Sequence, residues 1–208
     1  MAILEEISSF LQKGRTKNVK ELVTQALDEG IAPQAILEEG LLSGMAVIGE
    51  KFKNNEVFVP EVLVAARAMN AGTALLKPYL VQAGVEAKGT AVIGTVKGDL
   101  HDIGKNLVKM MIEGKGINVV DLGVDVTPEA FVTAAKENNA GIICCSALLT
   151  TTMPVMGEVV KAVKEAGLSA KVMVGGAPIT QEFADSIGAD AYTADAASAA
   201  MKAAELLA

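Results

Sequence analysis

Histidine is nearly absent from this sequence, whose 208 residues contain only His101. Metal sites that need two or more imidazoles from one chain, such as three-histidine zinc sites and two-histidine iron sites, are therefore excluded. The only two cysteines, Cys144 and Cys145, are adjacent. In an extended chain they point to opposite sides, so they cannot chelate a metal as a C-x-x-C pair does. No disulfide framework is present, which favours the cytoplasm as the compartment.

Positive charge is also scarce, because 18 Lys and Arg against 25 Asp and Glu give a net charge of −7. Nucleic acid binding needs clustered basic side chains, so we expect no nucleic acid partner. No uncharged apolar run reaches about 18 residues, and the N-terminus lacks a basic region followed by an apolar stretch. We therefore expect neither a membrane partner nor a signal peptide. Hydrophobic residues make up 51% of the chain, which is enough for a core and excludes disorder.

The N-terminal part has the spacing of amphipathic helices. Apolar residues recur at i, i+3, i+4, i+7 and i+8 within residues 19–27, and Gly30 ends this helix. A second helix with an apolar stripe is predicted over residues 33–48 and begins at Pro33. A third is predicted over about residues 60–80. Helices of this kind pack as a small bundle, so we predict a four-helix cap over residues 1–85.

The remaining sequence, residues 86–208, alternates between short apolar runs and helical segments. Strands are predicted at residues 90–96, 119–122, 141–145, 172–174 and 191–193. Runs that are apolar on both faces are typical of a parallel sheet covered by helices on both sides. We predict an α/β fold in which the cap is followed by a flavodoxin-like, Rossmann-like sheet of five parallel strands in the order 2-1-3-4-5.

Ligands of open parallel sheets bind beyond the carboxyl ends of the strands, where the strand order reverses. For this order, that point lies between the first and third strands. The segment after the first strand, residues 97–104, contains His101, and the segment after the third, residues 146–152, contains a row of hydroxyls. Gly175 and Gly176 follow the fourth strand and permit close approach to the backbone.

Several familiar sites do not match these segments. The glycine spacing in residues 98–106 differs from a P-loop, and no G-x-G-x-x-G follows the first strand to bind a dinucleotide. A hydrolase triad of Ser146, His101 and Asp99 is disfavoured because Ser146 lacks the flanking glycines of a nucleophile elbow. A purely structural alternative stays open, in which His101 caps a helix and Asp99 is a turn residue.

Residues 99–104 match the D-x-H-x-x-G motif of cobalamin-binding domains. Residues 146–148 resemble the S-x-L of that family, and residues 175–176 resemble its G-G. The N-terminal part contains Gly-Met-Ala-Val-Ile-Gly at residues 44–49, then Phe52, and then Phe-Val-Pro-Glu at residues 58–61. These segments resemble the four-helix cap of methionine synthase. Over nearly its whole length, the chain resembles the corrinoid (cobalamin)-binding methyl-carrier proteins of anaerobic corrinoid-dependent methyltransferase systems.

The resemblance implies that cobalamin or a related corrinoid binds base-off, with His101 as the lower axial ligand of its cobalt. Asp99 would accept a hydrogen bond from the other imidazole nitrogen. Thr152 would extend this relay to solvent, although it could also be the N-cap of a helix that has Pro154 in its first turn. When cobalt changes from methyl-Co(III) to Co(I), the released imidazole would take a proton, stabilised by Asp99. His101, Asp99 and Thr152 are therefore the candidate catalytic residues.

The resemblance also implies a wider set of cofactor-binding residues in the sheet domain. They are Gly98, Asp99, Leu100, His101, Asp102, Ile103, Gly104, Ser146, Leu148, Thr150, Gly175, Gly176 and Ala196. Ser146, Leu148 and Thr150 would line the slot for the displaced nucleotide tail. Gly175 and Gly176 would let that tail pass close to the backbone.

Three residues of the cap are implied as further cofactor contacts. Phe52 and Val59 would shield the methyl face of the corrinoid, and Glu39 would be another contact. For Phe52 and Val59, packing in the core of the bundle is the alternative interpretation.

The implied function is that of a methyl carrier, which is no enzyme on its own. It would accept a methyl group on cobalt through a barrel-type, donor-specific methyltransferase and pass it to a second methyltransferase that acts on tetrahydrofolate or coenzyme M. A reductive activase is a further possible partner. Two alternatives are a cobalamin-responsive sensor or regulatory module and, less favoured because of the cap, a mutase-type cobalamin subunit.

Overall fold

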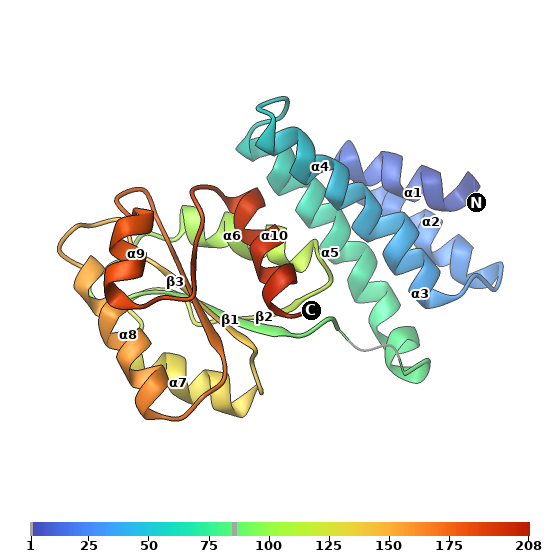
Figure 1. Cartoon of the computed structure of the whole chain (residues 1–208). Helices are drawn as coiled ribbons and strands as arrows, with labels where there is room; N and C mark the ends of the chain where they lie inside the picture. Colours follow the sequence, from blue (N-terminus) through green and yellow to red (C-terminus); the bar gives the residue numbers. More distant parts are fainter. Residues whose placement is uncertain (1, 85–86) are drawn as a thin grey trace. The chain divides into compact units, whose positions relative to one another are not determined.

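The computed structural model describes residues 2–84 and 87–208, which form two compact units (Figure 1). One unit comprises Met1–Glu86 and Gly114–Gly116, and the other comprises Ala87–Glu113 and Ile117–Ala208. The predicted domain boundary between residues 85 and 86 lies outside the described residues. None of the helices in the described ranges is long and apolar enough to cross a membrane.

The first unit is helical and has the predicted cap architecture. Its elements are α1 (Ala2–Gln12), α2 (Thr16–Asp28), α3 (Pro33–Ala35), the π-helix η1 (Ile36–Leu42), α4 (Ser43–Lys53) and α5 (Val59–Gln82). Because α3, η1 and α4 follow one another without a break, the unit amounts to four helical rods. The longest, α5, begins where the Phe58 amide donates to the Glu61 carboxylate (3.1 Å), and it packs along α2.

The second unit is an α/β sheet domain. Its strands are β1 (Thr90–Thr95), β2 (Asn118–Asp121), β3 (Ile142–Ser146), β4 (Lys171–Gly175) and β5 (Ala191–Tyr192). Its helices are α6 (Ile103–Glu113), α7 (Pro128–Glu137), α8 (Met153–Glu165), α9 (Gln181–Ile187) and α10 (Ala196–Leu206). All strand pairs are parallel and the order is β2-β1-β3-β4-β5, as predicted.

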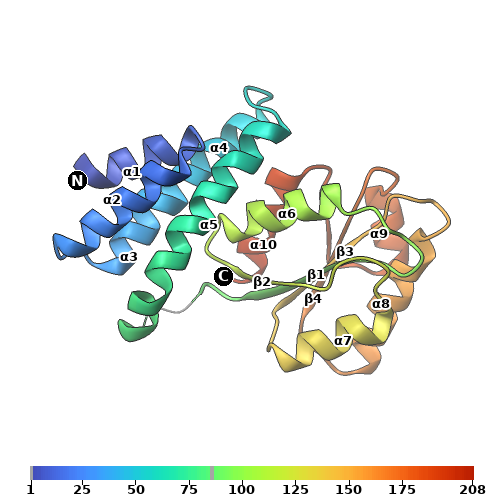
Figure 2. The same ribbon diagram turned by 180° about the vertical axis from the view of Figure 1, so that it is seen from behind.

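Helices cover both faces of this sheet (Figures 1 and 2). Helices α6 and α10 pack together over one face, whereas α7 and α8 pack together over the other. The central strands are consequently buried without alternation, and Ile142, Ile143 and Val92 are fully inaccessible. Cys144 and Cys145 are both free and buried, and Cys145 belongs to the core under α7 and α8.

Local sequence signals set the starts of several sheet-domain helices. Thr127 accepts a hydrogen bond from the amide of Ala130 and precedes Pro128, the first residue of α7. Asp195 accepts from the amide of Ser198 (2.8 Å) at the start of α10. These caps define where the chain leaves the carboxyl edge of the sheet, which is the edge where the candidate site residues gather.

Candidate functional site

The carboxylate of Asp99 is the centre of the site, in the loop between β1 and α6. Its side chain is fully buried. Oδ1 accepts hydrogen bonds from the amide of His101 (3.1 Å) and from its ring Nδ1 (2.7 Å). Oδ2 accepts from the amides of Leu148 (2.7 Å) and Leu149 (3.2 Å) and from the hydroxyl of Thr152 (2.9 Å). One carboxylate therefore joins the loop after β1 to the loop after β3.

These hydrogen bonds keep Asp99 ionised. Burial by itself raises the pKa of the carboxyl, but the bonds from the Leu148 amide, from the two His101 donors and from the Thr152 hydroxyl outweigh it. The pKa is held well below its usual range. Asp99 is thus a fixed negative charge at neutral pH and can only accept hydrogen bonds.

The state of Asp99 determines which nitrogen of His101 carries the proton. Because the carboxylate has no proton to give, Nδ1 must be the donor, and in the neutral imidazole the lone pair then lies on Nε2. Within residues 2–84 and 87–208, no hydrogen bond is made by Nε2. The side chain of His101 is 51% exposed, so this nitrogen is available to a ligand.

Thr152 lies at the N-cap position of α8, with Pro154 in the first turn, but its side chain makes no cap hydrogen bond. The hydroxyl instead lies 2.9 Å from Asp99 Oδ2, and the carbonyl oxygen of Leu149 is also 2.9 Å away. The carboxylate is the stronger acceptor for the single hydroxyl proton because it is charged. Thr152 is buried, so the predicted continuation of the relay to solvent stays a prediction.

Part of the structural alternative is correct, since the contact between Asp99 Oδ1 and the amide of His101 is a local turn bond between residues i and i+2. That interpretation does not account for the bonds from Leu148, Leu149 and Thr152, which lie about fifty positions later in the chain. Among the described residues, the ring of His101 makes no cap bond to α6. The turn is therefore one component of a longer-range arrangement.

Exposed apolar side chains lie next to His101 in the sequence and in the loop after β3 that is bonded to Asp99. Leu100 is 71% exposed and Ile103 78% exposed, on either side of His101. Leu148 and Leu149, whose amides bond to Asp99, are also exposed. Large apolar side chains left in water beside an available imidazole nitrogen indicate a ligand with a broad apolar face.

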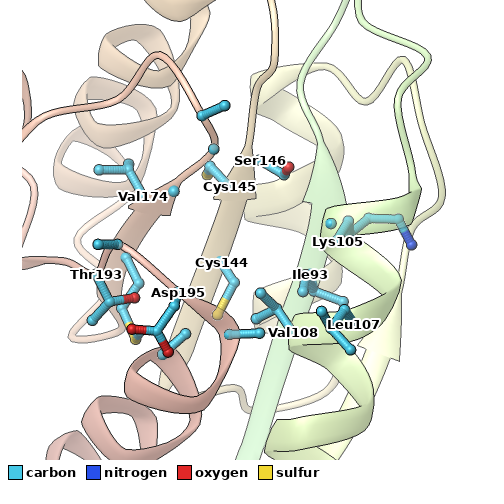
Figure 3. A pocket seen from close by; sticks show the side chains of 18 residues that line it. Ile93, Lys105, Leu107, Val108, Cys144, Cys145, Ser146, Val174, Thr193 and Asp195 are labelled. Carbon is cyan, nitrogen blue, oxygen red and sulfur yellow. The ribbon is translucent and has the colours of Figure 1, made fainter. Parts of the chain in front are cut away.

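A cavity of about 290 Å³ opens between α6, α10 and the carboxyl ends of β1, β3 and β4 (Figure 3). Several predicted binding residues line it: Gly104, Ser146, Gly175, Gly176 and Ala196. Ile93, Val108, Cys144 and Thr193 line it as well, and burial raises the pKa of the Cys144 thiol to about 12. The thiol is therefore neutral at physiological pH, and this wall of the cavity is apolar.

The space around the Cα atom differs among the glycines of the site. At Gly176, φ is 137° and an added Cβ would lie 1.8 Å from the carbonyl oxygen of Ala147, so the fold itself excludes a side chain there. An added Cβ at Gly104 would meet nothing within 4 Å, and one at Gly175 would meet only Thr193 O at 3.8 Å. The protein leaves open space at Gly104 and Gly175, where a bound ligand would need it.

Not all predicted site residues lie on this cavity. Leu148 and Thr150 are exposed and are absent from its wall. The reason is that β3 ends at Ser146, after which the chain turns so that the Leu148 and Leu149 amides face Asp99. Leu148 and Thr150 do not line this cavity, and their place beside a nucleotide tail stays a prediction.

Some site residues were missed by the sequence analysis. Asp125, in the loop after β2, accepts from the amide of Gly98 (2.7 Å) through Oδ1 and donates its own amide to the carbonyl of Asp99 (3.1 Å). The hydroxyl of Thr95 donates to the carbonyl of His101 (2.8 Å). The sequence could have indicated Thr95 and Asp125, because they lie at or after the carboxyl ends of β1 and β2. These strands are neighbours, so their carboxyl ends lie side by side.

The predicted contacts from the cap belong to the helical unit. Glu39 is exposed and lies within the π-helix η1, a local irregularity that is often found at functional sites. Phe52, near the end of α4, and Val59, the first residue of α5, are half-buried. All three are thus accessible on the surface of that unit, at least in part.

Across the described ranges, no group of three or more His, Cys, Asp and Glu side chains is arranged to hold a metal ion. His101 can supply one nitrogen, so a metal bound there would need further ligands from a bound group, from solvent or from another molecule. The chemistry of the donor set suits a metal that is enclosed in a macrocycle.

The sequence matches two families and several known proteins. Residues 89–204 match a family described as "B12 binding domain", and residues 3–77 match a second family with the same description. Trimethylamine corrinoid protein 1 of Methanosarcina acetivorans is 44% identical over 92% of this chain and 93% of its own length. Dimethylamine corrinoid protein 1 of the same organism is 44% identical over 99% of this chain and 98% of its own.

Solved structures extend the similarity to the fold. The methanol:cobalamin methyltransferase complex of Methanosarcina barkeri contains a chain that superposes with a TM-score of 0.90 at 30% identity, covering 99% of this chain and 80% of that chain. A cobalamin-binding protein from Desulfitobacterium hafniense superposes with a TM-score of 0.79 at 31% identity, and the match covers 98% of both chains.

Proposed function

The chain belongs to the family of corrinoid proteins with B12-binding domains, and from that premise we propose that it carries methyl groups between two partner methyltransferases. One observation supports this most directly. The single imidazole of the chain has Nδ1 tied to a buried carboxylate, whereas Nε2 is without a partner among the described residues and half-exposed. This is the arrangement of a histidine prepared to bind a metal through Nε2.

The surroundings of His101 fit a corrinoid bound base-off. The exposed apolar side chains of Leu100, Ile103 and Leu148 provide a surface for a flat macrocycle. The cavity beside α6 and α10 provides a slot for a displaced nucleotide tail, with open space at Gly104 and Gly175. When bound, the corrinoid would supply the cobalt on which a methyl group is carried, and the protein would bind, orient and tune it.

The lowered pKa of Asp99 keeps the carboxylate ionised, so it does not take the Nδ1 proton from His101. In the proposed cycle, an imidazole released from cobalt would take its proton on Nε2. The resulting imidazolium remains paired with Asp99 through Nδ1. Thr152 donates to the other carboxylate oxygen and stabilises the negative charge in both states.

The partners follow from the relatives. Because the similar chains are named for trimethylamine, dimethylamine and methanol systems, we propose a small methylated compound of this class as the donor. A donor-specific methyltransferase would load the protein, a second would unload it, and a reductive activase would restore it. We also propose that Glu39, Phe52 and Val59 contact the corrinoid from the cap. Two free, buried cysteines agree with a reducing compartment such as the cytoplasm.

Ligation by His101 is tested by loading the protein with cobalamin, reducing the cobalt to Co(II) with a chemical reductant and recording its EPR spectrum. A nitrogen splitting that changes when the protein carries ¹⁵N-labelled histidine identifies a protein imidazole as the ligand. We expect His101→Ala to retain some corrinoid and to lose the label-dependent splitting. Gln181→Ala, on an exposed position of α9, is the control. If the nitrogen splitting of the wild-type protein is the same with labelled and unlabelled histidine, base-off binding through His101 is refuted.

The carrier function is tested with candidate methyltransferases and donors. Addition of one donor together with its methyltransferase should produce the absorption spectrum of methylated cobalt. Trimethylamine, dimethylamine and methanol are the first donors to compare. Isolation of the native protein with an adenosyl corrinoid, and no methylation by any donor, would favour the sensor or mutase alternatives instead.

A further inference from the structure

Lys105 is a lysine in an unusual environment. Its side chain is only 2% exposed, yet the sequence analysis assigned it no role. It lies in the first turn of α6, directly after the D-x-H-x-x-G segment, and its stem contributes to the cavity wall while its ammonium points away from the cavity (Figure 3). A buried ammonium needs partners, and those partners connect Lys105 to the loop that carries His101.

The ammonium of Lys105 makes two short contacts. One is to Asp121 Oδ1 at the end of β2 (2.7 Å), and the other is to the side-chain oxygen of Asn106 (2.7 Å). The carboxylate of Asp121 is itself held in place by the amide of Gly123 (2.9 Å) and by Lys109 (3.2 Å). Burial raises the pKa of Asp121, but these hydrogen bonds and charges lower it overall, so the carboxylate is ionised.

The connection continues from Asn106 to the residue that follows His101. The amide of Asn106 donates to the carbonyl of Asp102 (2.8 Å), and its side-chain amide donates to Asp102 Oδ2 (3.1 Å). The chain of contacts therefore runs from β2 through Asp121, Lys105 and Asn106 to Asp102. On its other side, His101 is held through Asp99 by the loop after β3.

We propose that the Lys105–Asp121 ion pair is a second anchor for His101, which fixes the first turn of α6 to β2 so that the imidazole Nε2 keeps one position. Lys105 is accordingly a positioning residue for the proposed cobalt ligation, on which this inference rests. An apolar side chain could fill the same space, but it would not fix the turn to one carboxylate. Burial of two charges costs desolvation energy, so the role that we assign to this ion pair is in geometry and not in stability.

The first measurement uses the corrinoid-free, tag-free full chain, in which His101 is the only histidine. The Nδ1 proton of His101 should give one NMR signal that exchanges slowly with water, because it is bonded to the buried Asp99. Lys105→Met keeps the unbranched stem and removes the charge. We expect it to accelerate this exchange about tenfold, the ratio that corresponds to about 1.4 kcal/mol.

Lys109→Met is the matched control. It removes another lysine from the same carboxylate, but Lys109 is part-exposed and, within the described residues, forms no hydrogen bond with Asn106. We expect the exchange rate in Lys109→Met to remain within about twofold of the wild type. An unchanged rate in Lys105→Met, equal acceleration in both variants, or a fast-exchanging wild-type proton would each overturn the proposal.

A double variant separates positioning from simple burial of charge. Lys105→Met leaves Asp121 with one partner fewer, which could destabilise the fold by itself. Lys105→Met/Asp121→Asn removes both charges and should fold even if the single variant does not. If the ion pair positions His101, the double variant still exchanges its Nδ1 proton about tenfold faster than the wild type. Restoration of the wild-type rate would show that only the unpaired charge mattered.

The loaded protein provides the second measurement. In Lys105→Met we expect the ratio of imidazole-bound to imidazole-free cobalt, measured from the label-dependent EPR splitting, to fall about tenfold while the corrinoid content is retained. If the wild-type protein shows no such splitting, the proposed ligation fails. The role of Lys105 in positioning the imidazole is then still decided by the exchange rates of the corrinoid-free chain.

Discussion

The two units hold their candidate site residues by different interactions. In the sheet unit, His101 is attached to a buried carboxylate that receives five hydrogen bonds from the loops after β1 and β3. In the helical unit, Phe52 and Val59 are half-buried side chains at the end of one helix and the start of the next. Polar bonds have fixed directions and lengths, whereas apolar contacts tolerate small shifts.

One tight glycine from each unit shows the same difference. Gly176 faces the backbone carbonyl of Ala147, which cannot move without separating the loops after β3 and β4. Gly72 of α5 faces the end of the Leu41 side chain, where an added Cβ would lie 2.9 Å from Cδ2. A leucine can rotate away. At these two positions, the surroundings in the sheet unit are rigid, whereas those in the helical unit can adapt.

The largest effect should come from Gly176→Ala. Its backbone conformation alone costs a side-chain-bearing residue about 1–3 kcal/mol, and the contact with the Ala147 carbonyl adds to this. We expect the free energy of unfolding, measured with urea, to fall by about 4 kcal/mol or more, near the upper limit for one substitution. For Gly72→Ala we expect about 1 kcal/mol. Similar losses in both variants would contradict the difference between the units.

Asp99→Asn should have the next largest effect. Hydrogen bonds to charged groups contribute about 1.5–3 kcal/mol each, and the variant leaves several donors poorly paired, so we expect a loss of about 3 kcal/mol at pH 7. Asp185→Asn, an exposed substitution on α9, is the control and should change little.

The pH dependence of Asp99→Asn follows from the lowered pKa of Asp99. A carboxyl whose pKa is lower in the folded than in the unfolded state stabilises the protein above its unfolded pKa of about 3.9, and this stabilisation is lost as the pH falls towards the folded pKa. The difference in unfolding free energy between wild type and variant should therefore be constant from pH 7 to about pH 5 and shrink below about pH 4. A constant difference down to pH 2 would show that Asp99 is not stabilised as an anion.

Phe52→Ala should destabilise the protein less than Gly176→Ala or Asp99→Asn. A fully buried phenylalanine is worth about 3–5 kcal/mol, so we expect about 1–2 kcal/mol for this half-buried one. If Phe52 contacts the corrinoid, the loaded variant should also release the corrinoid several times faster than the wild type. Phe10→Ala, which removes a half-buried phenylalanine of α1, is the matched control. Equal release from both variants would favour the packing interpretation of Phe52.

Much of the fold could be predicted from the spacing of apolar residues and from the prolines and glycines at the ends of helices. Apolar runs without alternation indicated buried parallel strands, and five strands alternating with helices suited the flavodoxin-like order that the sheet has. The ends were less accurate, because β3 ends at Ser146 and not at Cys145. Such ends depend on hydrogen bonds to neighbouring loops, as with Ala147, whose amide donates to the carbonyl of Gly175.

The candidate site was predictable where residues are close in sequence. Asp99 and His101 are two positions apart, so their contact is nearly local. Lys105 and Asp125 were missed because their partners, Asp121 and Gly98, lie 16 and 27 positions away in the chain. No local spacing signals such a pair. For the same reason, the absence of Leu148 and Thr150 from the cavity could not be foreseen.

By itself, the sequence determined that one imidazole is available, that it follows a buried strand, and that it lies at the point where the strand order reverses. The tertiary structure alone decided which nitrogen of His101 is free. That choice depends on Asp99 being ionised, and the ionisation depends on donors from Leu148, Leu149 and Thr152, far along the chain. The pKa of a buried group is set by what surrounds it in space, and only folding brings those donors together.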